Sequence, residues 1–318
     1  MSTSRPDGGR RITAGASAGH GRRRPGKPSW LRVRVPDAAP FRATAGVLGD
    51  LGLRTVCEEA RCPNKGECFA AGTATFLILG DVCTRGCGFC AVARASAGSG
   101  LEPASRRGVD ADEPGRVAAA AARLGLSHVV VTSVTRDDLP DGGAAHYAAT
   151  ISAVRESLPA ASVEVLVPDF GGRPAALRTV LAARPDVLAH NLETVPRLYD
   201  AVRPGASYRR SLGLLGAAAR GKGPGGPALV KSGLMLGLGE TADEAGAVLA
   251  DCVAAGVDLV TVGQYLRPAE GCLPVARYVH PQEFAALLPL GERLGLRVVA
   301  GPFVRSSYRA AESFAARA

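Results

Sequence analysis

The sequence predicts an α/β protein built on an open, partial (β/α)6 barrel with N- and C-terminal extensions. Short runs rich in β-branched residues and leucine recur from Thr75 onward, and alanine-rich stretches with helical periodicity separate them. Glycine or proline marks the ends of most of these stretches. Strands that alternate with helices pair in parallel through right-handed crossovers, and six such units fall short of a closed eightfold barrel.

Six runs have the composition of buried strands: TFLILG (75–80), HVVVTS (128–133), SVEVLV (162–167), DVLAHN (186–191), ALVKSGLM (228–235) and DLVTVG (258–263). Between them, EPGRVAAAAARLGL (113–126) and DEAGAVLADCVAAG (243–256) are typical of amphipathic helices. A seventh short run, LRVVAG (296–301), leads into the C-terminal tail.

The chain divides into four pieces around these units. Its 318 residues suit one large α/β domain with extensions. Residues 1–27 are expected to be a disordered basic leader, and residues 28–74 an N-terminal extension with little apolar periodicity that folds around a metal site. The barrel then occupies residues 75–301, and residues 302–318 form a C-terminal extension.

The net charge of +9 is concentrated at the N-terminus. Residues 1–27 hold seven Lys and Arg residues against a single Asp, which leaves +3 for the rest of the chain. Such a leader is typical of a solvated segment, so the charge does not indicate a nucleic-acid partner. The leader lacks the apolar core of a secretory signal, and no window has the apolar length of a membrane helix. We therefore expect a cytoplasmic protein with neither a membrane nor a nucleic-acid partner.

Eight cysteines, six of them within one short window, indicate metal or redox chemistry rather than a disulfide framework. The six form an upstream set and a downstream set: Cys57, Cys62 and Cys68, then Cys83, Cys87 and Cys90. A structural zinc site needs four ligands, which neither set supplies alone. An iron–sulfur cubane held by three cysteines instead leaves one iron free of protein ligands and open to a substrate or cofactor.

Functional residues of (β/α) barrels cluster where strands end and loops begin. The downstream cysteines follow the first predicted strand directly. Thr132 and Ser133 end the second strand, Asn191 and Glu193 follow the fourth, and GLGE (237–240) follows the fifth. We expect these positions to converge on one rim of the barrel.

The stretch CTRGCGFC (83–90) resembles the C-x3-C-x2-C signature of the radical S-adenosylmethionine (SAM) superfamily, with an aromatic residue, Phe89, before the last cysteine. The resemblance implies a partial barrel of the radical SAM type. It also implies that the amino and carboxylate groups of SAM bind the open iron of the cluster.

Longer stretches resemble the lipoyl synthases in particular. The upstream VCEEARCPNKGEC (56–68), with C-x4-C-x5-C spacing, is similar to the additional cysteine motif of that family. Further matches are TSVTRDDLPDGGAAHY (132–147), AHNLETVPRLYDAVRPGASYRRSL (189–212), KSGLMLGLGET (231–241) and GPFVRSSYRA (301–310). The similarity runs from about Lys27 to Ala310.

This resemblance implies two 4Fe–4S clusters and SAM as cofactors. The implied ligands are Cys83, Cys87 and Cys90 for the radical SAM cluster, and Cys57, Cys62, Cys68 and Ser307 for an auxiliary cluster. The downstream cysteines and the serine are also the implied catalytic residues. Without the resemblance, Ser306 and Ser307 are more typical of a cap or turn in a surface tail than of a ligand.

By the same resemblance, the reaction inserts two sulfur atoms, at carbons 6 and 8, into an octanoyl group carried on a protein lysine. Its unactivated C–H bonds require radical chemistry; one SAM is used for each sulfur, and the auxiliary cluster supplies the sulfur. Candidates to hold the methionyl or ribose part of SAM lie in matched stretches: Thr132, Ser133, Asn191, Glu193 and Arg203. Helix capping or barrel packing is an alternative role for each of them.

The implied partners are octanoylated lipoyl carrier domains, namely dehydrogenase E2 subunits and the glycine cleavage H protein. A ferredoxin- or flavodoxin-type electron donor and a carrier protein that rebuilds the auxiliary cluster are also implied. At Cys272 the chain departs from the family pattern, where a histidine often precedes LPV, and we expect a neutral replacement. Cys252 lies in an alanine-rich helix and is expected in the core, and residues 136–138 are expected to form a salt-bridged loop.

Two other interpretations remain open. Another sulfur-inserting radical SAM enzyme, such as a biotin synthase or a methylthiotransferase, also pairs two clusters, but is not expected to combine the upstream spacing with a terminal RSSY. A zinc-stabilised nucleic-acid-binding protein would explain the basic leader and the clustered cysteines. It would not explain the six βα units or the unpaired cysteine spacing.

Overall fold

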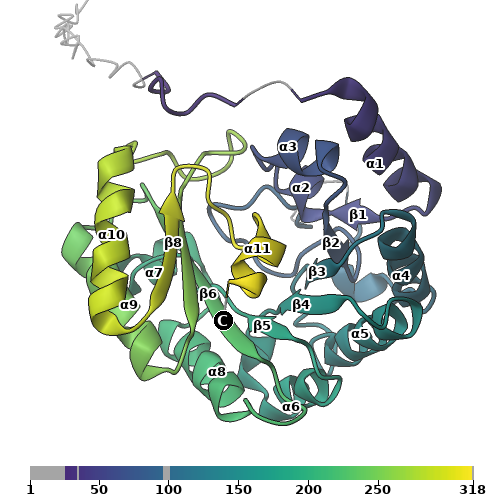
Figure 1. The fold of residues 1–318 in the computed structure, drawn as a ribbon. Helices are drawn as coiled ribbons and strands as arrows, with labels where there is room; N and C mark the ends of the chain where they lie inside the picture. Colours follow the sequence, from purple (N-terminus) through teal and green to yellow (C-terminus); the bar gives the residue numbers. More distant parts are fainter. Residues whose placement is uncertain (1–25, 34–35, 96–100, 317–318) are drawn as a thin grey trace, which may run out of the picture.

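The structure, a computed structural model, describes residues 26–33, 36–95 and 101–316. Almost all of the leader that was predicted to be disordered therefore lies outside the described residues. The described chain forms a curved, largely parallel sheet surrounded by helices (Figure 1). The α/β partial barrel predicted from the sequence is confirmed.

The strands of the described chain follow one another across a single sheet in the order of the sequence. They are β1 (Arg54–Thr55), β2 (Thr75–Ile78), β3 (His128–Ser133), β4 (Ser162–Leu166), β5 (Val187–Ala189), β6 (Leu229–Leu236), β7 (Leu259–Gln264) and β8 (Arg297–Gly301). β2 to β8 are parallel, and β1 pairs antiparallel with β2. Within the described residues β1 and β8 do not pair, so the sheet stays open.

Helices connect the parallel strands, as crossover connections require. The α-helices of the described chain are α1 (Ala38–Asp50), α2 (Val56–Glu59), α3 (Lys65–Ala70), α4 (Glu113–Arg123), α5 (Ala144–Ser157), α6 (Pro174–Ala182), α7 (Tyr199–Val202), α8 (Tyr208–Arg220), α9 (Ala242–Ala254), α10 (Pro281–Leu294) and α11 (Ala310–Ala315). Short 3-10 helices occupy Ala104–Arg106, Phe170–Gly172 and Pro196–Leu198. α4 and α9 coincide within three residues with the two stretches predicted to be helical.

The seventh run, LRVVAG, continues the sheet instead of only leading into the tail. α10 ends at Gly295, whose φ of 67° gives the left-handed turn that glycine adopts without strain. β8 then pairs in parallel with β7, with Val298 opposite Val260. The β-branched valines of this run suit a strand, so the barrel has one parallel strand more than the six predicted.

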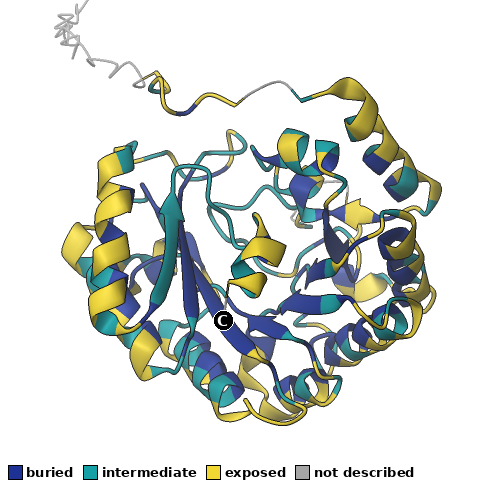
Figure 2. Ribbon diagram, viewed as in Figure 1, coloured by how far each residue is buried: buried dark blue, intermediate teal, exposed yellow. Residues whose placement is uncertain are grey.

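β2 to β7 are mostly buried on both faces, which explains why the sequence shows them as continuous apolar runs. Figure 2 shows buried strands inside a ring of helices whose outer faces are exposed. Val131, Val163, Leu188 and Val230 belong to the main core, which the helices complete on the outer side of the sheet.

The inner face of the sheet is filled at the amino ends of the strands by the C-terminal helix. Phe314 of α11 packs with Val187, Leu229 and Leu259, each at or next to the start of its strand, and with Val299 of β8. α11 lies in the middle of the ring of strands in Figure 1. This helix therefore closes the end of the barrel opposite the loops that carry the predicted site.

A buried charged group lies on the same inner face. Lys231 Nζ donates to Glu164 Oε1 at 2.9 Å, and His128 Nε2 lies 3.2 Å from Glu164 Oε2. Burial by itself raises the pKa of a carboxyl group, but the Lys231 and His128 contacts outweigh burial and lower the pKa of Glu164. These partners satisfy one another and form part of the barrel floor.

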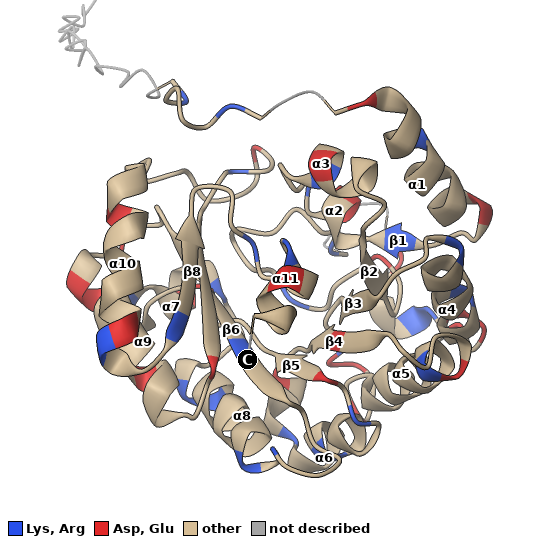
Figure 3. Ribbon diagram, in the orientation of Figure 1, with Lys and Arg blue, Asp and Glu red and all other residues tan. Residues whose placement is uncertain are grey.

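Charged residues of both signs are distributed over the helices and loops around the sheet (Figure 3). None of the helices within the described ranges is both long enough and apolar enough to cross a lipid bilayer.

Candidate active site

A cavity of about 630 Å³ opens at the carboxyl ends of the strands. The predicted functional residues in its wall are Cys62, Cys83, Cys87, Cys90, Thr132, Ser133, Asn191, Glu193, Arg203 and Ser307. Cys57, Cys68 and the GLGE stretch (237–240) are not in the wall. Glu240 instead accepts hydrogen bonds from its own loop, at 2.6 Å from Gly237 N. The expected convergence on one rim is therefore confirmed except for GLGE.

The loop of the downstream cysteines is held by the backbone of its neighbours. Thr84 N donates to Thr135 O at 3.0 Å, Gly88 N donates to Val202 O at 2.8 Å, and Leu273 N donates to Gly88 O at 2.7 Å. A Cβ atom at Gly88 would lie 2.8 Å from the Leu273 side chain, so glycine alone permits this approach. These hydrogen bonds join the loop of the downstream cysteines to the loops after β3 and β7 and to the end of α7.

The three downstream thiols all line the cavity and act on one another electrostatically. Cys83 Sγ accepts N–H groups from Arg85 at 3.4 Å and from Thr135 at 3.3 Å. Burial raises the pKa of Cys87, and it raises that of Cys90 to about 12; the charge of the neighbouring cysteines adds to both shifts. A bound metal deprotonates such thiols, so a cluster held by them would release protons on binding.

The upstream cysteines lie on and between two short helices. Cys57 is in α2, Cys68 is in α3, and Cys62 lies between them with its N–H donating to Cys57 O at 3.0 Å. Burial raises the pKa of Cys57 to about 11 and that of Cys68 to about 12, and the charge of Cys62 contributes to both shifts. The three thiols therefore form a second electrostatically coupled set.

Each cysteine set fits a cluster better than a single ion. In the described part of the chain, no three His, Cys, Asp or Glu side chains converge closely enough to bind one metal ion. A zinc ion needs its ligands at one centre, whereas the ligands of a cubane bind different irons and stay apart. Coupled but separated thiols therefore match a 4Fe–4S cluster.

The RSSY segment (305–308) is anchored beside the upstream cysteines. Asn64 donates from Nδ2 to Phe303 O at 2.7 Å, and Tyr308 Oη donates to Glu67 Oε1 at 2.8 Å. Asn64 and Glu67 both lie between the second and third upstream cysteines in the sequence. Ser307, which lines the cavity, is thereby held next to that set.

On its other side, the same segment lies against β6 and β7. Gly263 approaches Val304 O so closely that a Cβ atom has no space there. A Cβ atom at Gly233 would lie 2.7 Å from Asn191 Oδ1, the atom that accepts a hydrogen bond from Ser306 Oγ at 2.6 Å. Two glycines on neighbouring strands therefore allow the C-terminal tail to enter the mouth of the barrel.

A buried polar group follows β5. Glu193 has a φ of 67°, rare outside glycine, and its N–H donates to Gly233 O at 2.9 Å. Asn191 Nδ2 donates to Glu193 Oε1 at 3.0 Å, and Arg203 Nη1 donates to Asn191 O at 2.8 Å. Burial raises the pKa of Glu193 in spite of the opposing charge of Arg203.

One N–H group of the Arg203 guanidinium has no hydrogen-bond acceptor in the described structure. The Arg203 side chain is 8% exposed, and within the described structure its Nε has no hydrogen-bond partner. An unpaired buried donor destabilises a fold by roughly 1–3 kcal/mol, and Arg203 Nε is such a donor, in a residue that lines the cavity. Thr132 differs, because its Oγ1 donates to Leu166 O at 2.9 Å and so joins β3 to β4.

The remaining cysteines and the acidic loop lie as predicted. Cys252 is fully buried in α9. Cys272 lines the cavity, and its Sγ donates to Cys90 O at 3.5 Å. Arg136 Nη2 and Asp138 Oδ2 form an ion pair at 2.9 Å inside the predicted salt-bridged loop, whereas Asp137 pairs with Arg85 outside it.

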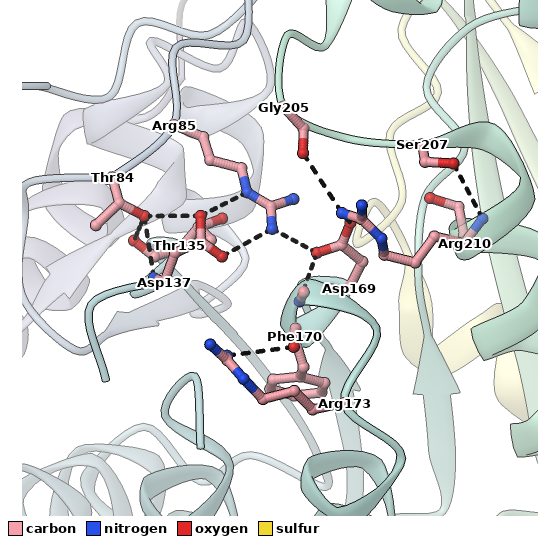
Figure 4. A network of polar contacts seen from close by, with 12 residues as sticks. Thr84, Arg85, Thr135, Asp137, Asp169, Phe170, Arg173, Gly205, Ser207 and Arg210 are labelled. Carbon is pink, nitrogen blue, oxygen red and sulfur yellow. Dashed lines mark hydrogen bonds and ion pairs between the residues drawn. The ribbon is translucent and has the colours of Figure 1, made fainter. Parts of the chain in front are cut away.

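No role was predicted for Arg85, Asp169 or Arg305, all of which the fold brings to the site. Arg85, inside the downstream cysteine loop, pairs with Asp169 at 2.6 Å (Figure 4). Arg305 lines the cavity, and the charges of Cys62 and Glu193 act on it. An arginine inside a motif is visible in the sequence. Its partners are not, because they lie far away along the chain.

Known proteins match this chain along most of its length. Residues 77–252 match the Radical SAM superfamily. The lipoyl synthase of Nitratidesulfovibrio vulgaris (strain DP4) is 54% identical over 288 residues, which cover 90% of this chain and 92% of that protein. The chain belongs to the lipoyl synthase family. It is therefore a radical SAM enzyme, and this superfamily uses a 4Fe–4S cluster and SAM.

Two further lipoyl synthases are similar to this chain at comparable identity and coverage. That of Rubrobacter xylanophilus is 53% identical over 292 residues, covering 92% of this chain and 87% of the relative. That of Trichlorobacter lovleyi is 56% identical over 286 residues, covering 90% and 97%. The coverage includes both cysteine sets and extends beyond the superfamily match on both sides, so the family is shown for nearly the whole chain.

Solved structures at low identity support the fold alone. The FeFe-hydrogenase maturase HydG from Carboxydothermus hydrogenoformans aligns with a TM-score of 0.53 at 16% identity, covering 70% of this chain and 52% of that one. Methylornithine synthase aligns with a TM-score of 0.51 at 16% identity, covering 70% and 62%.

Proposed function

We propose that this member of the lipoyl synthase family binds two 4Fe–4S clusters and inserts two sulfur atoms, at carbons 6 and 8, into a protein-bound N6-octanoyl-lysine. One observation carries the proposal: both cysteine sets contribute to the wall of a single cavity that Ser307 also lines. When bound, the clusters and SAM supply the radical and the sulfur that unactivated C–H bonds require.

The polar wall of the cavity suits SAM. The positive charge of Arg203 in the wall suits a carboxylate, and Asn191 and Glu193 offer acceptors to amino or hydroxyl groups. Ser133 lies in the same wall. These residues bind and orient the cofactor, and none of them is required to move a proton.

The apolar wall suits an alkyl chain. Leu77, Val134, Leu166, Leu234 and Met235 line the cavity together with the polar residues. Apolar contacts of this kind bind an eight-carbon chain and exclude water, which protects a reactive radical from side reactions.

The substrates and partners follow from this assignment. We place octanoylated lipoyl carrier domains, of dehydrogenase E2 subunits and the glycine cleavage H protein, at the mouth of the cavity. A ferredoxin- or flavodoxin-type protein supplies electrons, and a carrier protein rebuilds the auxiliary cluster. All eight cysteines are free thiols, which suits a reducing compartment such as the cytoplasm.

The test is metal content followed by turnover. Protein reconstituted without oxygen should hold about eight irons and eight sulfides per chain, the content of two 4Fe–4S clusters. Replacing Cys57, Cys62 and Cys68 together by alanine should remove roughly half of each. Mass spectrometry of an octanoylated carrier domain should then show two added sulfurs with the unsubstituted protein only. Bound zinc with almost no iron would overturn the proposal.

A further inference from the structure

We propose that Arg85 is a positioning residue for the radical SAM cluster. Its guanidinium, paired with Asp137 and Asp169, holds the downstream cysteine loop and contributes to the electrostatic potential at the cluster. The inference rests on the proposed function, because it requires a cluster at the downstream cysteines.

The geometry joins three consecutive loops. Arg85 lies in the loop after β2, Asp137 in the loop after β3 and Asp169 in the loop after β4. Arg85 Nε donates to Asp137 Oδ2 at 2.7 Å, and Nη2 donates to Asp137 Oδ1 at 2.8 Å, a two-pronged pairing that fixes the plane of the guanidinium. Nη2 also donates to Asp169 Oδ1 at 2.6 Å (Figure 4).

Both carboxylates are themselves held in place. Thr84 Oγ1 donates to Asp137 Oδ2 at 3.2 Å. Asp169 accepts from Gly171 N at 3.1 Å and from Arg210 Nη1 at 3.0 Å, which adds α8 to the network. Two arginines and two aspartates therefore form a nearly neutral group next to the cysteine loop: Arg85, Arg210, Asp137 and Asp169.

The Arg85 side chain is only 9% exposed, so solvent and salt screen its charge poorly. The same residue also contacts the cysteines directly, because Arg85 N donates to Cys83 Sγ at 3.4 Å. Asp169 stays ionised, because its arginine contacts outweigh burial and lower its pKa to about 2. Positive charge favours the reduced, more negative state of a cluster, and negative charge disfavours it.

Removing the charge of Arg85 and removing the charge of an aspartate partner should therefore shift the reduction potential of the cluster in opposite directions. Arg85→Gln leaves two carboxylates behind the loop and should lower the reduction potential of the cluster. Asp169→Asn leaves an excess arginine and should raise it. Asp137→Asn should raise it less, because the Asp137 side chain is 37% exposed while that of Asp169 is fully buried.

The measurement is a redox titration of the reconstituted full-length protein, followed by electron paramagnetic resonance. The radical SAM cluster is recognised as the one whose signal changes when SAM is added. Arg85→Lys separates charge from positioning, since it keeps the charge but not the two-pronged pairing. In Arg85→Lys the reduction potential of the radical SAM cluster should stay near that of the unsubstituted protein. The same cluster should lose iron faster to a chelator.

The exposed ion pair of Arg123 and Asp50, also 2.7 Å long, provides the control. Arg123 ends α4 before β3 begins, at the end of the barrel away from the cavity. Arg123→Gln and Asp50→Asn should leave the reduction potential of the cluster unchanged.

Shifts of the reduction potential that are equal or have the same sign in Arg85→Gln and Asp169→Asn, at normal iron content, would overturn the inference. Should either variant fail to fold, the sign of the Asp137→Asn shift decides. Absence of any SAM-responsive signal from the unsubstituted protein would instead reject the proposed function together with this inference.

Discussion

His190 lies in the cavity wall with both ring nitrogens hydrogen-bonded. Nδ1 lies 2.8 Å from Val167 O, which can only accept, so Nδ1 carries the proton. Nε2 then accepts from Ser211 Oγ at 2.9 Å. Burial, together with the charge of Arg203, lowers the pKa of His190 from 6.5 to about 4. The imidazole is therefore neutral and structural at neutral pH.

This shift has a consequence for stability. Between about pH 6.5 and about pH 4 the unfolded chain binds a proton at His190 that the folded chain does not bind. The free energy of unfolding should fall as the pH falls through this window, by up to about 1.4 kcal/mol per pH unit. Urea unfolding of the apoprotein across the window measures the slope. His190→Gln should flatten it, and an unchanged slope in that variant would contradict this account.

As the proposed fourth ligand of the auxiliary cluster, Ser307 offers an oxygen where a thiolate would hold iron more firmly. Oxygen is the harder donor, and an alkoxide is released when it is protonated. A replaceable ligand suits a cluster that gives up its sulfur. Ser307→Cys should therefore yield an auxiliary cluster that resists a chelator longer, with slow or absent sulfur insertion.

Iron release and single-turnover lipoyl formation measure the two effects of Ser307→Cys separately. Ser306→Cys, one residue away, should give no such protection, because the Ser306 hydroxyl bonds to Asn191. Normal sulfur insertion by Ser307→Cys would show that a labile ligand is not needed.

At the scale of elements, the decisive contact joins the C-terminal tail to the sheet and to α3. Gly263 of β7 has no space for a Cβ atom because the backbone of Val304 lies over it. Gly263→Ala should displace the RSSY segment and loosen the auxiliary site, while the downstream cysteine loop stays intact. The auxiliary cluster should then lose iron, and the SAM-responsive signal should remain.

Gly213→Ala in α8 is the matched control for Gly263→Ala. An added Cβ atom meets nothing within 4 Å there, and alanine favours a helix over glycine by about 1 kcal/mol. It should keep all of its iron and unfold at a slightly higher temperature. Full iron content in Gly263→Ala would show that the close approach of the tail does not position Ser307.

The elements themselves were largely predictable. Each of the six predicted strands overlaps an observed one, because buried parallel strands are short apolar runs that need no knowledge of their neighbours. DVLAHN forms a strand only over Val187–Ala189, since the chain then turns to place Asn191 and Glu193 in the cavity wall. α2 and α3 were not predicted, because they are too short for a helical period to appear.

At the scale of the whole molecule, α11 closes the end of the barrel at the amino ends of the strands. Phe314 is partly buried there, so Phe314→Ala should lower the free energy of unfolding by about 2 kcal/mol, below the roughly 3–5 kcal/mol of a fully buried phenylalanine. Denaturant unfolding measures the change. Leu288→Ala on the exposed side of α10 should cost less than about 0.5 kcal/mol. Equal losses in the two variants would show that α11 does not contribute to the core.

The sequence by itself determined the α/β class, the two cysteine sets and the family, because period, spacing and motif are local properties of a chain. The tertiary structure alone decided how these parts meet. Asn64 reaches Phe303 across 239 positions, and Arg85 reaches Asp169 across 84. No local pattern encodes such pairs, because they arise only when the sheet curves and brings the carboxyl ends of its strands around one cavity. The same curvature gives the tail its path into the barrel, where Ser307 lines the same cavity as Cys62 and α11 fills the floor.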